Sequence, residues 1–218
     1  MESKLFTPVT FGPLTLRNRT IRSAAFESMC PGNAPSDMLL DYHRSVAAGG
    51  IGMTTVAYAA VTQSGLSFDR QLWMRPEIIP GLRRLTDAIH AEGAAAGIQL
   101  GHCGNMSHKS ICGCMPVGAS SGFNLYSPTF VRGLRADELP EMARAYGRSV
   151  NLAREAGFDS VEIHAGHGYL ISQFLSPSTN HRKDEFGGSL QNRMRFMDMV
   201  MEEVMKAAGS DMAGGGGS

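Results

Sequence analysis

The sequence predicts an α/β fold in which strands and helices alternate four times along the chain. Three observations support this prediction. Short apolar segments recur along the chain, each is followed by a segment with helical spacing of apolar residues, and glycines close most of the helical segments. Strands separated by helices pair in parallel through right-handed crossovers, so we expect one parallel sheet covered by helices.

The first strand is predicted in "RTIRSAAF" (19–26), and the helix after it in "SDMLLDYHRSVAAGG" (36–50). Ser36 is a residue type that caps helix N-termini, and the two closing glycines can end the helix. The segment "IGMTTVAYAAV" (51–61) is apolar and rich in β-branched and small residues. This composition is typical of a strand that is buried on both faces.

The second helix is predicted in 75–93, because apolar residues recur there at helical spacing: Ile78, Leu82, Leu85 and Ile89. "AAAGIQL" (94–100) is predicted to be the third strand. A long loop rich in Gly, Ser, Cys and Pro is expected over roughly 102–136.

The third helix is predicted in 136–157 and the fourth strand in "FDSVEIH" (158–164). A last amphipathic helix is expected over about 189–208, with four apolar residues on one face: Phe196, Met199, Val200 and Val204.

Two architectures fit four such units: an open parallel sheet, or part of a (βα)8 barrel. A complete barrel typically needs about 250 residues, and this chain has 218. "GGGGS" follows the last helix and has the composition of a flexible linker. We therefore expect a (βα)4 domain (1–212) and a linker-like tail (213–218), with no fifth strand.

Composition limits the class of protein. Apolar residues make up 43% of the chain, and 20 basic residues balance 20 acidic ones. Nothing in this balance favours nucleic acid or a membrane surface as a partner. No apolar run is long enough to span a bilayer, and no signal-like segment opens the chain, so a cytoplasmic location is expected. The four cysteines are then expected to be thiols.

Polar or aromatic residues stand at the carboxyl end of each predicted strand. In parallel βα folds these ends open on one face, where functional groups collect. In chain order the residues are Ala25, Phe26 and Glu27, then Tyr58, then Gln99, and finally His164, His167 and Tyr169.

The end of the fourth strand has the residues best suited to chemistry. His164 and His167 can present ring N–H donors to an anionic oxygen, and Tyr169 keeps a proton that it can donate below about pH 10. Structural explanations stay open at this stage. A strand-end histidine often serves only as a hydrogen-bonding group, Gln99 can cap neighbouring backbone, and Glu27 can be a solvated loop charge.

The loop contains a second cluster of residues that can bind metal: His102, Cys103, His108, Cys112 and Cys114. Zinc sites use such ligands, but the Cys-X-Cys pair is tighter than the usual Cys-X-X-Cys, and no second pair matches it. A loop with free thiols that covers part of a pocket is favoured, and a zinc-binding module remains an alternative.

The segment "EIHAGHGYLISQFLSPSTNHRKDEFGGSLQNRMRF" (162–196) closely resembles the signature region of the old yellow enzyme family. That family comprises FMN-dependent ene-reductases and their 2,4-dienoyl-CoA reductase relatives. "LFTPVTFGPLTLRNRTIRSA" (5–24) and "GIQLGHCGN" (97–105) resemble its N-terminus and third strand. The resemblance, which runs from about residue 5 to about 208, implies the N-terminal (βα)4 half of a TIM (βα)8 barrel. FMN would lie across its carboxyl mouth, with NADH or NADPH as reductant.

The resemblance also implies roles for individual residues. It implies that His164 and His167 bind the carbonyl oxygen of an activated alkene, and that Tyr169 protonates the α-carbon after the flavin delivers hydride to the β-carbon. Hydrogen-bond donors to a developing oxyanion contribute about 3–4 kcal/mol each in a hydrolase. Flavin-binding positions are implied for Ala25, Phe26, Glu27, Tyr58, Gln99 and His164.

Three residues depart from the family pattern. Glu27 stands where Cys or Thr is usual, Asn105 replaces an Arg, and Tyr58 is bulkier than the usual residue. The family's fifth-strand Arg and its phosphate-binding loops of the seventh and eighth strands are also missing. The sequence therefore predicts an ene-reductase-type oxidoreductase half that needs a complementary half-barrel or a second copy. The alternative is a non-catalytic, engineered or truncated half-barrel that self-associates through open sheet edges.

Overall fold

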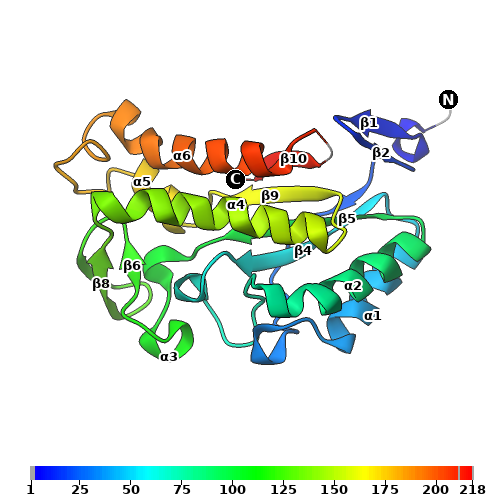
Figure 1. Ribbon diagram of the computed structural model, residues 1–218, viewed down its shortest axis with the longest axis horizontal. Coiled ribbons are helices and arrows are strands. Elements are labelled where there is room, and N and C mark those ends of the chain that lie inside the picture. The colour runs from blue at the N-terminus through cyan, green and yellow to red at the C-terminus, as the bar shows by residue number, and fades with distance from the viewer. Residues whose placement is uncertain (1–2, 211, 218) are drawn as a thin grey trace.

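A parallel sheet lies at the centre of the molecule (Figure 1). The structure is a computed structural model and describes residues 3–210 and 212–217. The strand order is β10-β9-β5-β4-β3, and all neighbouring strands are parallel. The strands are β3 (Ile21–Arg22), β4 (Met53–Ala60), β5 (Ala95–Gly101), β9 (Ser160–His164) and β10 (Ala213–Gly217).

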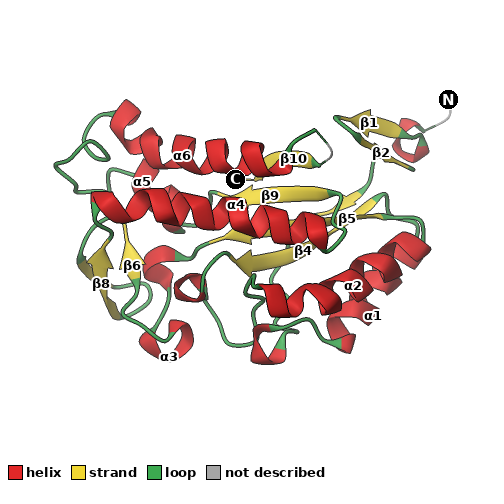
Figure 2. Cartoon of the chain, viewed as in Figure 1, coloured by secondary structure: helices red, strands yellow, loops and turns green. Residues whose placement is uncertain are grey.

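A long helix follows each of the first four strands, which confirms the predicted strand–helix alternation. Neighbouring helices contact one another in the order of their strands: α1 with α2, α2 with α4, and α4 with α6. Figure 2 shows these helices along the outside of the strands, as in a segment of a barrel. Their bounds are α1 (Asp37–Ala48), α2 (Ile79–Ala91), α4 (Leu139–Glu155) and α6 (Leu190–Ala208).

Local sequence signals explain where these helices begin and end. Ser36 caps α1, because its side chain accepts a hydrogen bond from Leu39 N at 3.2 Å. Ser189 caps α6 in the same way. Gly93 and Gly157 have φ of +78° and +87° just beyond α2 and α4, a conformation that glycine adopts without a Cβ clash.

The core lies between the sheet and the helices. Alternate residues of β5 and β9 point to opposite sides of the sheet, so Ile98 and Leu100 face the helices while Gln99 faces the other way. Burying each large apolar side chain contributes about 1.5–3 kcal/mol. Fully or almost fully buried members of this core include Ile98, Leu100, Val161, Ile163, Leu82, Leu85, Ile89, Tyr146 and Phe196.

The Gly-rich tail differs from its prediction as a linker without a fifth strand. Ala213–Gly217 form β10, which pairs in register with Ser160–His164 of β9. The Ala213 amide also donates to Asp159 O at 3.0 Å. Glycines carry no side chains that show a strand pattern, so only the free hydrogen-bonding edge of β9 accounts for this strand.

The predicted loop 102–136 also differs from expectation, because it contains regular structure. It holds α3 (Lys109–Cys112) and a small sheet in the order β6-β8-β7. The strands are β6 (Val117–Gly118), β7 (Gly122–Asn124) and β8 (Thr129–Gly133), and this sheet lies at the left of Figure 1, on the side toward which β4 and β9 point.

One further strand differs from its predicted boundaries, and a hairpin and a short helix were not predicted. The first strand of the large sheet is only Ile21–Arg22, shorter than the predicted 19–26. A hairpin, β1 (Val9–Phe11) and β2 (Leu14–Leu16), precedes it, and a short helix, α5 (Leu170–Leu175), follows β9. In the part of the chain that the structure describes, no helix is long and apolar enough to cross a membrane.

Candidate active site

A cavity of about 210 Å³ opens at the carboxyl ends of the parallel strands. Its walls come from the segment after β3, from β4, from β5, and from the end of β9 and the turn that follows. The structure therefore brings together every site residue that the sequence analysis selected: Ala25, Phe26, Glu27, Tyr58, Gln99, His164, His167 and Tyr169.

We call His164, His167 and Tyr169 the histidine–tyrosine site. His164 ends β9 and is buried, whereas His167 is exposed. Burial, and secondarily the charge of His167, lower the pKa of His164 to about 4, so this ring is neutral at pH 7. His164 Nε2 and His167 Nδ1 lie 3.2 Å apart and share a hydrogen bond. The Tyr169 ring stands edge-on to His164, with centroids 5.0 Å apart.

The turn that holds His167 has an unusual backbone. His167 and Gly168 have φ of +55° and +69°, and a non-glycine residue with positive φ is costly and often found at functional sites. The buried amide of Gln173 on α5 holds this turn in place, because Gln173 Nε2 donates to Gly168 O at 2.6 Å. The same nitrogen contacts Cys103 O at 3.1 Å and Asn105 Oδ1 at 2.9 Å.

Sequence reasoning missed Gln173, although a glutamine on the apolar side of a short helix is a signal that could have indicated it. The contact with Gln173 also gives Asn105 a structural role. Asn105 is one of the three residues that depart from the family pattern. Its backbone amide and side chain both bond Gln173. Together these bonds join the turn after β9 to the segment after β5.

The two tyrosines of the cavity differ in what their hydroxyls can do. Tyr58 donates its hydroxyl proton to Gly65 O at 2.5 Å and is buried, so its ring acts as a wall. Burial raises the pKa of Tyr58 well above 10. Burial also raises the pKa of Tyr169, with a smaller opposing effect from Ser67. Tyr169 therefore keeps its proton at neutral pH, and its ring lies 5.5 Å from that of Tyr58.

Gln99 is fixed by a neighbour on the next strand. Its Nε2 donates to Glu162 Oε1, and the two residues are direct register partners on β5 and β9. The bond orients the amide plane, with the Gln99 side chain in the cavity wall.

Glu27 is neither a solvated loop charge nor a free carboxylate in the cavity. Its side chain is only 4% exposed, and Oε1 lies 2.7 Å from Arg22 Nη1 and 2.9 Å from His43 Nε2. Its Oε2 accepts from Ala57 N at 3.3 Å. We call Arg22, Glu27 and His43 the Glu27 cluster. His43 comes from α1, and its other ring nitrogen bonds Thr54 Oγ1 at 2.8 Å.

The rim of the cavity contains residues that the sequence analysis did not select. Phe68 packs against Phe26 with ring centroids 4.6 Å apart. Arg70 is exposed beside them and has φ of +60°. Arg70 therefore places a guanidinium at the edge of the cavity in a backbone conformation that few side chains adopt.

The loop residues considered as metal ligands do not converge on one point, although Cys112 and Cys114 lie close to each other. His102 is buried and accepts from Gly104 N through Nδ1 at 2.9 Å, and burial lowers its pKa to about 3. Its Nε2 lies 3.1 Å from Ser64 Oγ. Among residues 3–210 and 212–217, no three His, Cys, Asp or Glu side chains are grouped to hold a metal ion. The described residues thus provide no donor set for the zinc alternative.

Comparison with known proteins places the chain in a family. Residues 4–215 match the model of the NADH:flavin oxidoreductase / NADH oxidase family. The chain is 43% identical to 4,4'-dithiodibutanoate disulfide reductase of Rhodococcus erythropolis, covering 96% of this chain and 52% of that protein. It is 37% identical to NADPH dehydrogenase of Bacillus subtilis, covering 94% of this chain and 60% of that protein.

Solved structures show the same relationship. An old yellow enzyme homologue from Zymomonas mobilis superposes with a TM-score of 0.89 at 30% identity, covering 97% of this chain and 62% of that one. Morphinone reductase in complex with tetrahydroNAD gives 0.89 at 28% identity, covering 98% and 63%. This chain therefore corresponds to part of an old yellow enzyme barrel, which confirms the predicted partial TIM barrel.

The chain spans about half the length of the relative with 43% identity and 60% of the Bacillus subtilis protein. The family description and these relatives imply FMN as the flavin and NADH or NADPH as the reductant. The sequence match over almost the whole chain and the superposition of the fold agree. The chain belongs to the NADH:flavin oxidoreductase / NADH oxidase family, the family of the old yellow enzymes.

Proposed function

We propose that this chain provides the substrate-activating half of an FMN-dependent oxidoreductase that reduces activated C=C bonds with NADH or NADPH. One observation supports the proposal above all others. Gln99, His164, His167 and Tyr169 come from two strands and the turn after β9, and all line one cavity.

The residues of the cavity fit the ring system of FMN. A flat heteroaromatic ring needs apolar or aromatic surfaces against its faces and hydrogen-bonding groups at its edges. The apolar and aromatic surfaces are supplied by Ala25, Phe26 and Tyr58. The hydrogen-bonding group at the ring edge is the fixed amide of Gln99. When bound, FMN would supply the redox chemistry, accepting electrons from NADH or NADPH and passing them to the alkene.

His164 and His167 would bind the carbonyl oxygen of the substrate. In the structure the two rings bond each other over 3.2 Å. A substrate oxygen that enters between the two rings would replace the hydrogen bond between them. It would then accept one N–H hydrogen bond from each ring. The low pKa of His164, about 4, keeps that ring a neutral donor. Hydrogen bonds from both rings would stabilise negative charge that develops on the oxygen.

Tyr169 would protonate the α-carbon of the substrate. Its raised pKa keeps the hydroxyl protonated at neutral pH, and its ring borders the cavity next to His164. Tyr58 cannot replace it, because the Tyr58 hydroxyl is already bonded to Gly65 O. Proton donation by a positioned acid contributes about 10²–10⁴-fold to a rate.

A Tyr169→Phe variant tests this role. In the FMN-loaded protein that joins this chain to a complementing barrel half, the rate of 2-cyclohexenone reduction should fall by about 10²–10⁴-fold. The rate at which NADPH bleaches the flavin should not change, because that step needs no proton from Tyr169. Stopped-flow absorbance separates the two rates, and an equal loss in both would show that Tyr169 does not act as the proton donor.

We further propose that a complementary half-barrel, or a second copy of the chain, completes the FMN site. The cavity wall contains one guanidinium, Arg70, and it is exposed at the rim. A single guanidinium offers too few hydrogen-bond donors to bind the phosphate of FMN tightly, because proteins usually hold a phosphate with several backbone and side-chain donors. The monomeric chain should therefore bind FMN weakly in a fluorescence titration, and tight binding by the monomer would contradict this part of the proposal.

An S–S bond is a second candidate acceptor at the same cavity. It is suggested by the relative at 43% identity, whose name describes the reduction of 4,4'-dithiodibutanoate disulfide. NADPH oxidation by the same FMN-loaded protein, measured with 2-cyclohexenone and with 4,4'-dithiodibutanoate, compares the two acceptors. A clear preference for the disulfide would overturn the alkene assignment.

A further inference from the structure

Two thiols lie close together in the loop segment after β5, away from the candidate active site. Cys114 Sγ is 3.9 Å from Cys112 Sγ. The helix α3 ends at Cys112, and Gly113 follows with φ +75° and ψ −3°. This left-handed turn reverses the chain, which brings the next side chain back beside Cys112. Glycine adopts this conformation without a Cβ clash.

The two thiols are in different environments. Cys112 is buried, and its Sγ contacts His108 O at 3.3 Å and Cys114 O at 3.2 Å. Cys114 is exposed. An exposed thiol beside a buried one is the arrangement in which the first can react with an external molecule and the second can only react with the first.

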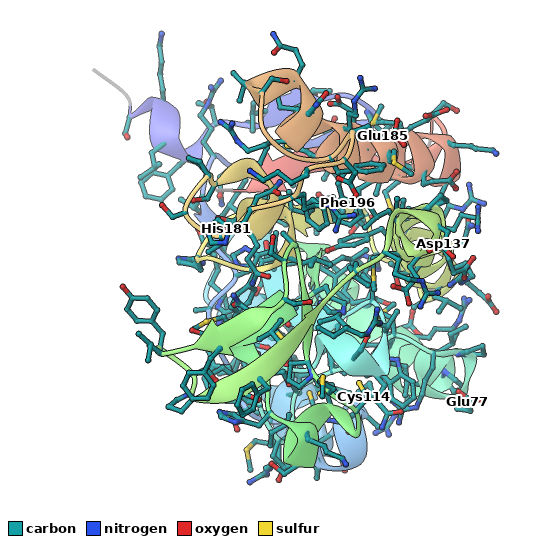
Figure 3. All side chains as sticks on the ribbon, turned by 90° about the vertical axis from the view of Figure 1, so that its left-hand side faces the viewer. Glu77, Cys114, Asp137, His181, Glu185 and Phe196 are labelled. Carbon is teal, nitrogen blue, oxygen red and sulfur yellow. The ribbon has the colours of Figure 1, made fainter. Side chains whose placement is uncertain are left out.

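Cys114 also lines a second cavity, of about 570 Å³, between the loop and α4. Figure 3 looks onto this end of the molecule and labels Cys114 together with Asp137, another residue of the cavity wall. The apolar part of the wall is formed by Met115, Val117, Leu134, Met142 and Ala145.

The charged residues of this wall are paired with one another. Arg132 bonds Glu138 at 2.7 Å, Arg135 bonds Asp137 at 3.1 Å, and Arg148 bonds Glu141 at 2.8 Å. Positive and negative charges therefore balance around the cavity. Together with the apolar part of the wall, this balance suits a small neutral organic molecule better than an ion.

We propose that Cys112 and Cys114 form a thiol–disulfide exchange site for small neutral organic disulfides. The Cys114 thiolate attacks one sulfur of the ligand, so the ligand S–S bond breaks, a mixed disulfide forms at Cys114, and one ligand thiol leaves. Cys112 then attacks Cys114 Sγ, which forms the Cys112–Cys114 disulfide and releases the second ligand thiol. The protein dithiol loses two electrons and two protons, and the ligand gains them as two thiols.

The other two cysteines cannot take this role. Cys30 and Cys103 are both buried, and burial raises the pKa of each thiol to about 12. Burial and the neighbouring Cys112 also raise the pKa of Cys114, while Arg132 opposes this rise. The exchange should therefore be slow at neutral pH, and it is best measured under mildly alkaline conditions.

The test uses the complete 218-residue chain and bis(2-hydroxyethyl) disulfide, without FMN or NADPH. Intact-mass spectrometry should show a loss of two hydrogen atoms, peptide mapping should locate the new bond between Cys112 and Cys114, and dithiothreitol should reverse both. Cys112→Ser should instead keep one hydroxyethylthio group on Cys114. Cys114→Ser should react at least about tenfold more slowly, because its remaining thiols are buried.

Cys30→Ser is the matched control, and it should react as the unchanged chain does. Circular dichroism of every variant establishes that it is folded. The proposal is overturned if the unchanged chain retains a hydroxyethylthio adduct, if it does not react, or if Cys114→Ser reacts at the original rate. Because no flavin takes part, any of these results leaves the proposed alkene reduction unaffected.

Discussion

The histidine–tyrosine site and the Glu27 cluster are both partly or fully buried polar groups at the carboxyl edge of the same sheet, yet they are arranged in opposite ways. In the Glu27 cluster a carboxylate lies 2.7 Å from Arg22 Nη1 and 2.9 Å from His43 Nε2. In the histidine–tyrosine site the two imidazole rings share one hydrogen bond, 3.2 Å long. The carboxylate of the first group is paired within the protein, and the second group keeps donors for a ligand.

This difference shows that the end of a parallel strand does not by itself make a residue reactive. Position brings a side chain to the mouth of the fold, but its internal partners decide what remains available to a substrate. Glu27 lines the cavity and is nevertheless bonded to its own neighbours. We therefore expect substitutions in the two groups to affect different measurements.

Glu27→Gln should produce the largest loss of stability. The change removes the negative charge beside Arg22 and His43, so the mostly buried guanidinium of Arg22 loses its charged partner and keeps only its hydrogen bond to Thr55 O. Removing one member of a buried ion pair costs about 3–5 kcal/mol, measured as the free energy of unfolding in urea. The control Glu77→Gln alters an exposed side chain and should stay within about 0.5 kcal/mol of the original value. Equal losses in the two variants would contradict the structural role of the Glu27 cluster.

Gln173→Leu should have a smaller effect that reaches the histidine–tyrosine site. It removes the donor to Gly168 O, Cys103 O and Asn105 Oδ1, and a buried polar group left without a partner costs about 1–3 kcal/mol. The turn that holds His167 should also loosen. Alkene reduction by the FMN-loaded protein should therefore slow more than flavin bleaching by NADPH.

Gln191→Leu, on an exposed position of α6, is the matched control and should change neither rate. If Gln173→Leu lowered stability but left alkene reduction unchanged, Gln173 would be a structural residue only.

Much of the fold and of the cavity could be predicted because local patterns determine them. Apolar spacing located the four strand–helix units, and the parallel arrangement then placed the carboxyl ends of the strands together. This is why residues as distant in sequence as Phe26, Gln99 and Tyr169 share one cavity.

The bonding partners could not be predicted, because they join residues far apart in sequence. Glu27 Oε1 lies 2.9 Å from His43 Nε2 of α1, and Gln173 bonds Asn105. No local pattern records either contact. The strand β10 was missed for a different reason. Four of its five residues are glycines, so its identity as a strand depends on the pairing edge of β9 and not on its own side chains.

Acid should weaken the folded state partly through His164. Its pKa is about 4 in the folded protein and about 6.5 in an unfolded chain. As the pH falls below about 6.5 the unfolded chain gains a proton that the folded chain does not take, so stability decreases between about pH 6.5 and 4. His102, with a pKa of about 3, acts in the same direction. His90 acts in the opposite direction, because the hydrogen bond that its ring donates to Asp159 raises its pKa.

The measurement is the free energy of unfolding in urea at a series of pH values, for the unchanged chain and for His164→Gln. The variant should lose less stability over this interval, because one group that binds a proton only when unfolded has been removed. An unchanged pH dependence would mean that His164 is not held neutral by burial.

Arg84→Gln should cause the smallest loss in the free energy of unfolding. It tests whether burial is the reason that the ion pair of the Glu27 cluster contributes more to stability than an exposed ion pair. Arg84 Nη2 lies 3.0 Å from Asp37 Oδ1, but the two side chains are 69% and 79% exposed. Water solvates both charges when the bond breaks, so the loss in unfolding free energy should be below about 1 kcal/mol, and added salt should reduce it further. A loss as large as that of Glu27→Gln would mean that ion pairing alone explains the stability of both pairs. The contrast between a buried, paired carboxylate and an available site would then need another physical basis.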